Sequence, residues 1–116
     1  MSRRGSFWAS ICSAAALVAA CATAVPRPTE GDQARAAARW PDLGPTDLDD
    51  GRALYVNRCS GCHALVPPKS RPPMAWPHEV ALMSERAGLD DRERELVTRY
   101  VVTMSEERPA SPAPAE

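Results

Sequence analysis

The chain has 116 residues, which is enough for one small domain and no more. Its 14 basic and 15 acidic side chains nearly cancel, for a formal net charge of −1. Because the sequence contains no basic run or patch, its composition argues against nucleic acid as a partner.

The first residues, 1–20, have the pattern of a secretory signal. Arg3 and Arg4 form a charged start, and an apolar run follows from Ile11 through Ala20. This run is too short to serve as a durable membrane-spanning helix. It ends in Val18-Ala19-Ala20-Cys21, which resembles a bacterial lipobox. We therefore predict a lipoprotein signal peptide over 1–20 and a lipid anchor on Cys21; the alternative is an ordinary signal peptide with an incidental cysteine.

Low-complexity segments flank the part of the chain that is expected to fold. Prolines and glycines in residues 21–45 surround an Ala/Arg-rich patch, and we predict a flexible, lipid-anchored tether there. Residues 105–116 are rich in Pro and Ala and are predicted to form a disordered tail. The remaining domain, 46–104, is close to the lower size limit for a hydrophobic core. A buried cofactor with an apolar face would supply the missing core.

A first helix is predicted over Asp47–Arg58. Thr46 is a plausible N-cap residue, with Asp49 at the position where Glu or Gln would complete a capping box. Gly51 is a poor helix former in the interior and costs about 1 kcal/mol relative to Ala. We expect another backbone to approach it closely.

This helix leads into Cys59-Ser60-Gly61-Cys62-His63, and C-x-x-C-H is the attachment sequence of a c-type haem. Two thiols at this spacing can add to the vinyl groups of one porphyrin, and the next residue then lies under the iron. We therefore predict one covalent haem c on Cys59 and Cys62, with His63 as the proximal iron ligand. A disulfide, a thioredoxin-like redox pair and half of a zinc site are less favoured, because no strand-rich pattern and no second C-x-x-C accompany the motif.

A proline-rich loop follows His63 and is expected to wrap the proximal side of the haem. A backbone carbonyl near Pro67 or Pro68 is the expected acceptor for the second ring nitrogen of His63. A second helix is predicted from Pro77 to about Ala87, stopped by Gly88. Its inward face is formed by Trp76, Val80, Met83 and Ala87.

A third helix is predicted from the residue after Asp90 to about Met104. Asp90 and Glu93 form a D-x-x-E version of the capping box. The predicted buried stripe consists of Leu96, Val97, Tyr100, Val101 and Met104. The side chains expected to face water are Arg92, Arg94, Glu95 and Arg99.

The pattern as a whole resembles a small monohaem class I cytochrome c domain carried by a bacterial lipoprotein. The resemblance rests on Gly51-x-x-Leu54-Tyr55 ahead of C-x-x-C-H, and on a terminal amphipathic helix with Leu96 and Tyr100. It implies an all-α fold of about three helices wrapped around the haem, in which the first and last helices cross at a glycine. The segment between the haem motif and the last helix is shorter than is common in that family, so the loop that usually holds the sixth ligand is hard to place.

Four side chains are candidates for the sixth ligand, the distal ligand of the haem iron. Met83 is preferred and Met74, in the proline-rich loop, is the runner-up. His78 would give a bis-His haem of lower potential but lies off the inward face of its helix. Met104 is expected to pack at the helix crossing. If none of them binds, the iron is five-coordinate.

These patterns predict an electron carrier and not an enzyme, since no catalytic constellation accompanies the haem motif. The expected protein is tethered to a membrane outside the cytoplasm, on the periplasmic side, and exchanges single electrons with unidentified redox proteins. Ala22 and Thr23 lack the Asp that commonly retains lipoproteins at the inner membrane, which favours the outer membrane. The alternatives are an electron-transfer subunit of a larger dehydrogenase or reductase, and a five-coordinate haem sensor or minor peroxidase.

Overall fold

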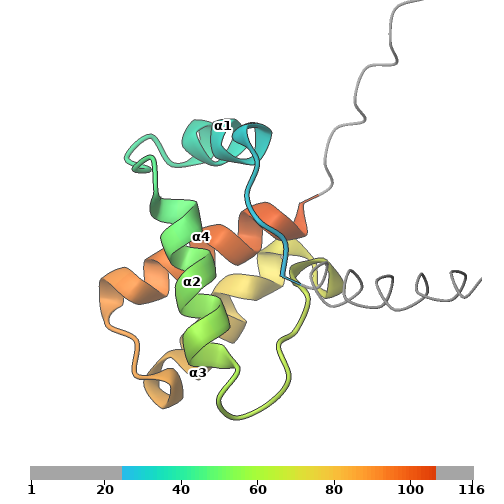
Figure 1. The fold of residues 1–116 in the computed structure, drawn as a ribbon, viewed down its shortest axis with the longest axis vertical. Helices are drawn as coiled ribbons and strands as arrows, with labels where there is room; N and C mark the ends of the chain where they lie inside the picture. The colour runs from blue at the N-terminus through green and yellow to red at the C-terminus, as the bar shows by residue number, and fades with distance from the viewer. Residues whose placement is uncertain (1–24, 107–116) are drawn as a thin grey trace, which may run out of the picture.

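The computed structural model describes residues 25–106, and within this range the chain forms α-helices, short 3-10 turns and no strand (Figure 1). The predicted all-α class is confirmed. The α-helices are α1 Glu30–Arg39, α2 Asp47–Cys59, α3 Trp76–Ala87 and α4 Asp91–Ser105; the 3-10 turns are η2 Pro68–Ser70 and η3 Pro73–Ala75. The predicted signal peptide, Cys21 and the tail from residue 107 lie outside the described residues.

Helix α4 is the centre of the fold, and α2 crosses it in Figure 1. The crossing occurs at Gly51. A β-carbon built there would lie 2.8 Å from the carbonyl carbon of Leu96 and 2.9 Å from the β-carbon of Tyr100. The close backbone approach expected at this glycine is therefore confirmed.

The predicted ends of α3 and α4 are also confirmed. Gly88 has φ 65° and ψ 36°, the left-handed conformation that glycine adopts easily, and it ends α3. The Asp90 side chain accepts a hydrogen bond from the Glu93 N–H, while the Glu93 side chain accepts one from the Asp90 N–H. Both halves of the predicted capping box are present.

The start of α2 differs from the prediction. Thr46 has helical dihedral angles and its side chain caps no N–H group of the helix. Its hydroxyl donates instead to the Asp50 carboxylate, with 2.9 Å between the oxygens. Asp49 is exposed and completes no capping box. The carboxylate of Asp47 accepts the N–H of Gly44 and so organises the turn before the helix.

The segment predicted as a tether contains α1, which packs against α4. This is a difference from the expectation for residues 21–45. The helix begins with a capping box in which Thr29 accepts the Asp32 N–H and Asp32 accepts the Thr29 N–H. Ala36 and Asp32 are buried against the rest of the fold. Alanine repeats favour a helix as readily as a linker, and the caps and a small buried face decided between the two here.

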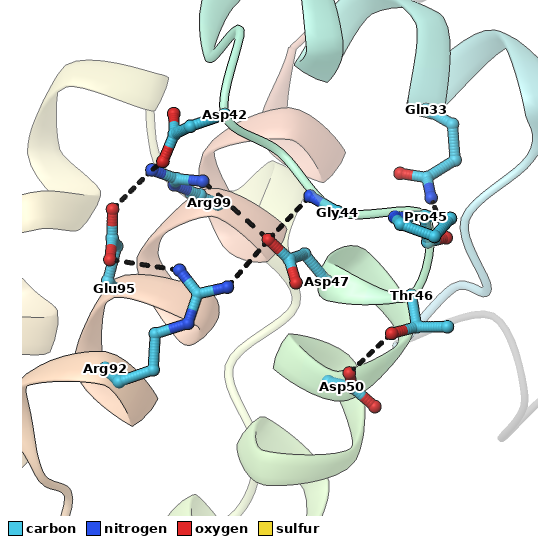
Figure 2. Close-up of polar contacts among 10 residues, drawn as sticks. All are labelled: Gln33, Asp42, Gly44, Pro45, Thr46, Asp47, Asp50, Arg92, Glu95 and Arg99. Carbon is cyan, nitrogen blue, oxygen red and sulfur yellow. Dashed lines mark hydrogen bonds and ion pairs between the residues drawn. The ribbon is translucent and has the colours of Figure 1, made fainter.

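Arg99 was predicted to face water and is buried, with a side chain only 5% exposed. Figure 2 shows its guanidinium between the carboxylates of Asp42, Asp47 and Glu95. The guanidinium carbon of Arg99 lies over the ring of Trp40, 5.7 Å from the ring centroid. Helical spacing places Arg99 on the polar side of α4, but the segment before α2 folds over that side and covers it.

The hydrophobic core follows the predicted stripe of α4. Val97, Tyr100, Val101 and Met104 are buried there, and Val102 joins them. Tyr55 from α2 together with Trp76 and Val80 from α3 complete the cluster. The three predicted helices therefore meet along one apolar seam, and its open end lies at the cysteine motif.

Candidate functional site

One pocket lies between the end of α2, the turn after it and α3. Its walls are mainly apolar, it is open to solvent, and its volume is about 200 Å³. The predicted site residues that line it are Cys59, Cys62, His63 and Met83.

The two cysteines come from different local structures. Cys59 is the last residue of α2 and is half buried, whereas Cys62 lies in the exposed turn that follows. Both are free thiols. Burial raises the pKa of the Cys59 thiol, so it stays protonated near neutral pH. Reactive dithiol pairs depend on a lowered thiol pKa, and the environment of Cys59 acts in the opposite direction.

The imidazole of His63 is exposed and is oriented by its own neighbour. Its Nδ1 lies 2.7 Å from the carbonyl oxygen of Ala64. A carbonyl only accepts, so Nδ1 carries the proton in this contact, and Nε2 is the nitrogen left to bind a metal in the neutral ring. That is the arrangement of a histidine prepared to bind a metal through Nε2.

The prediction that a carbonyl near Pro67 or Pro68 accepts from His63 is wrong, because His63 uses Ala64 instead. The carbonyls near those prolines bind other side chains. The carbonyl oxygen of Pro68 accepts the indole N–H of Trp76 at 2.9 Å. The neighbouring carbonyl of Val66 accepts the hydroxyl of Tyr55. A buried tyrosine hydroxyl or tryptophan N–H needs a hydrogen-bond acceptor, and the loop carbonyls provide it. These two bonds hold the proline-rich loop against the core.

The inner wall of the pocket is aromatic and aliphatic. The rings of Tyr55 and Trp76 meet edge to face, with centroids 6.2 Å apart and an interplanar angle of 88°. Val80 and Val97 lie beside them. Burial raises the pKa of Tyr55 to about 12, so its hydroxyl stays neutral and remains a hydrogen-bond donor. This part of the wall is therefore uncharged.

The candidates for the sixth ligand are not equally placed. Met83 lines the pocket and its residue is 38% exposed. Met74 is 86% exposed and is not among the residues that line the pocket. His78 is exposed and also absent from the lining, while Met104 is buried in the core. The geometry brings only Met83 to the same pocket as the cysteine motif, and its role as a ligand stays a prediction.

Three arginines also line this pocket, and the sequence reasoning did not include them. They are Arg58, Arg71 and Arg86, and the one acidic residue in the lining is Glu79, whose carboxylate lies 3.4 Å from Arg71. Arg58 and Arg86 belong to the last turns of α2 and α3, where cations are favoured by the helix dipole. That position is a signal the sequence contained. Arg71 lies in the loop, and nothing in the local sequence marks it.

The pocket brings together several kinds of donor group. It offers two thiols, an imidazole with a free nitrogen, a thioether and a mainly apolar wall, together with positive charge for carboxylates. Within residues 25–106, no three His, Cys, Asp or Glu side chains gather as a site for a bare metal ion. None of the helices described is long and apolar enough to cross a membrane.

No family model matches the chain, and neither a curated protein nor a solved structure resembles it significantly.

Proposed function

We propose that this protein is a monohaem c-type cytochrome that carries single electrons between redox partners outside the cytoplasm and is attached to a membrane through Cys21. The observation that carries the proposal is the meeting of Cys59, Cys62, His63 and Met83 at one mainly apolar pocket. Met83 is 20 residues distant from His63 in the sequence, and it reaches the pocket only because α3 folds back towards the end of α2.

The proposal assigns a role to each part of the pocket. Cys59 and Cys62 would hold the haem through thioether bonds, and His63, whose ring is oriented by the hydrogen bond to Ala64, would bind the iron through Nε2. Tyr55, Trp76 and the valines beside them exclude water from the inner wall. The haem supplies a one-electron Fe(II)/Fe(III) couple when bound.

The arginines of the pocket fit the same proposal. A haem carries two propionate carboxylates, which need hydrogen-bond donors or positive charge when they are placed against protein. Arg58, Arg71 and Arg86 provide guanidinium groups at the pocket. Arg58 also pairs with Glu93 at 3.6 Å and Arg71 with Glu79 at 3.4 Å, so a propionate would share these two arginines with protein carboxylates.

The thiol chemistry of Cys59 argues against another interpretation of the C-x-x-C motif, a dithiol redox protein. Such a protein needs an exposed cysteine with a lowered pKa. Cys59 is half buried at a helix C-terminus, and its pKa is raised. Helix C-termini also disfavour a thiolate, because the dipole is negative at that end.

The test is covalent haem attachment in a host that has cytochrome c maturation factors. The full chain is expected to keep its haem through denaturation and acid extraction, and its intact mass should include one haem. Cys59→Ser and Cys62→Ser should each retain at most one thioether bond, and the double variant should lose the haem on extraction. A wild-type chain without covalent haem would contradict the proposal.

A further inference from the structure

The chain just after the predicted lipid site is fastened to the domain. The carbonyl oxygen of Val25 accepts two hydrogen bonds from Arg52 on α2, from Nε at 3.2 Å and from Nη2 at 3.1 Å. The carbonyl oxygen of Pro26 accepts the Tyr100 hydroxyl at 2.7 Å. Val25 also packs against the hydrophobic core. The domain therefore includes residue 25, some 20 residues before the predicted boundary at 46.

We call residues 25–42 the N-terminal strap. The part of the strap after Pro26 is also held along α4. From α1, Arg35 donates to the carbonyl oxygen of Thr103 at 3.4 Å, and Arg39 pairs with Glu106 at 2.5 Å. Beyond α1, the Asp42 carboxylate pairs with buried Arg99 at 2.7 Å, as Figure 2 shows. Hydrogen bonds, ion pairs and apolar contacts thus fasten the strap at several points along its length.

This attachment leaves little chain between the lipid and the folded domain. Only Ala22, Thr23 and Ala24 separate Cys21 from Val25. At about 3.3–3.6 Å per residue, the α-carbons of Cys21 and Val25 can be at most about 14 Å apart. A free tether from 21 to 45 would instead have a root-mean-square span of about 25–30 Å and a much longer maximum reach.

The fastening points lie close to the pocket. Arg52, which holds Val25, precedes Cys59 by seven residues in the same helix, which corresponds to about 10 Å along the axis. Tyr100, which holds Pro26, contacts Tyr55, a residue of the pocket wall, with ring centroids 6.0 Å apart. The strap therefore connects the anchor to helices that also line the pocket.

We propose that the N-terminal strap holds the pocket within about one domain diameter of the lipid bilayer and restricts its orientation. The inference rests on the proposed lipid anchor at Cys21. In this arrangement the domain stays at the membrane surface. With a free tether over residues 21–45 it would instead move on a long linker. Electron exchange is then restricted to partners that are embedded in the same membrane or bound at its surface.

Neutron reflectometry of the lipidated full-length protein on a supported phospholipid bilayer measures this arrangement. We expect one protein layer that starts at the headgroups and extends about one domain diameter, ~30 Å. Insertion of a twelve-residue Gly/Ser linker between Thr23 and Ala24 should move the centre of that layer outward by roughly 10 Å. A wild-type layer as extended as that of the insertion variant would overturn the inference.

Variants in the strap contacts test the cause. The double variant Arg52→Met with Tyr100→Phe removes the donors to Val25 and Pro26, and its layer should broaden outward while its circular dichroism stays helical. Arg27→Met is the matched control, because Arg27 is an exposed arginine of the same strap. A double variant whose layer coincides with that of the wild type would show that these contacts do not hold the domain.

The anchor itself is checked separately by the mass of the N-terminal peptide. If Cys21 carries no lipid and the chain does not bind the bilayer, the anchoring part of the proposed function fails, and the membrane placement fails with it. If the lipid is present and the layer is diffuse, only the strap inference fails. Haem content affects neither readout.

Discussion

Gly51 of α2 lies directly against the main chain of Leu96 on α4, with no room for a side chain between the two helices. A β-carbon at this position would lie 2.8 Å from the carbonyl carbon of Leu96, a separation that real β-carbons do not show. The crossing brings Tyr55 onto Tyr100 and thereby sets the inner wall of the pocket. The close contact therefore links the stability of the fold to the shape of the site.

We expect Gly51→Ala to destabilise the protein by about 1–3 kcal/mol, because the helices must separate to admit the methyl group. The gain in helix propensity, about 1 kcal/mol, opposes this effect and is smaller. Gly31→Ala is the matched control within a helix, since its nearest neighbour would be Thr29 Oγ1 at 3.8 Å. Urea unfolding of both variants provides the comparison; equal stabilities would contradict the tight crossing.

Buried Arg99 should contribute to stability far more than an exposed arginine of the same helix. Arg99→Met removes the ion pairs with Asp42, Asp47 and Glu95, and we expect a loss of about 1–3 kcal/mol in the free energy of unfolding. Arg94→Met is the control: Arg94 is 46% exposed and pairs with Asp91, which is 94% exposed. Its change should stay within about 0.5 kcal/mol. Similar losses in the two variants would show that the network around Arg99 is only a surface feature.

Stability should fall in acid because of the same network. The hydrogen bond from Arg99 lowers the pKa of Asp42. For Asp47, burial acts to raise the pKa, but the Gly44 N–H and the Arg92 and Arg99 side chains together lower it. A carboxyl whose pKa is lower in the folded state contributes stability above its unfolded pKa and loses it as the pH falls through the folded value.

We therefore expect the free energy of unfolding to decrease as the pH drops below about 4. The double variant Asp42→Asn with Asp47→Asn should show a shallower decrease, because it lacks these two carboxylates. Chemical unfolding at a series of pH values measures both slopes. Parallel curves for wild type and variant would show that other carboxyl groups cause the acid sensitivity.

The axial ligand of the proposed haem can be identified by spectroscopy of two methionine variants. Met83 lines the pocket and Met74 does not, so Met83→Ala should abolish the ferric thioether charge-transfer band, open the iron to carbon monoxide and lower the reduction potential. Met74→Ala should leave the spectrum unchanged. Loss of the band in Met74→Ala with its retention in Met83→Ala would reverse the assignment.

The sequence by itself determined the local structure of most of the domain. The capping box at Asp90 and Glu93, the left-handed Gly88 and the apolar stripe of α4 depend on residues close together in the chain, so helical geometry was enough to predict them. The C-x-x-C-H motif is local in the same sense, and the haem chemistry that its spacing predicts stays a prediction. Even the role of Gly51 could be anticipated, because a glycine inside a helix needs a reason.

The tertiary structure alone decided the features that depend on contacts between distant residues. Arg99 has the spacing of a surface residue and is buried because residues 40–47 fold over it. Residues 25–39 have the composition of a linker, yet Arg52 and Tyr100 hold their first carbonyls and α4 supports their helix. Met83 lies on the predicted inward face of its helix and Met74 lies in the proline-rich loop, but only the packing of α3 shows which of the two reaches the pocket. Composition and periodicity depend only on residues that are close together in the sequence. The burial of a side chain also depends on which distant segments pack over it.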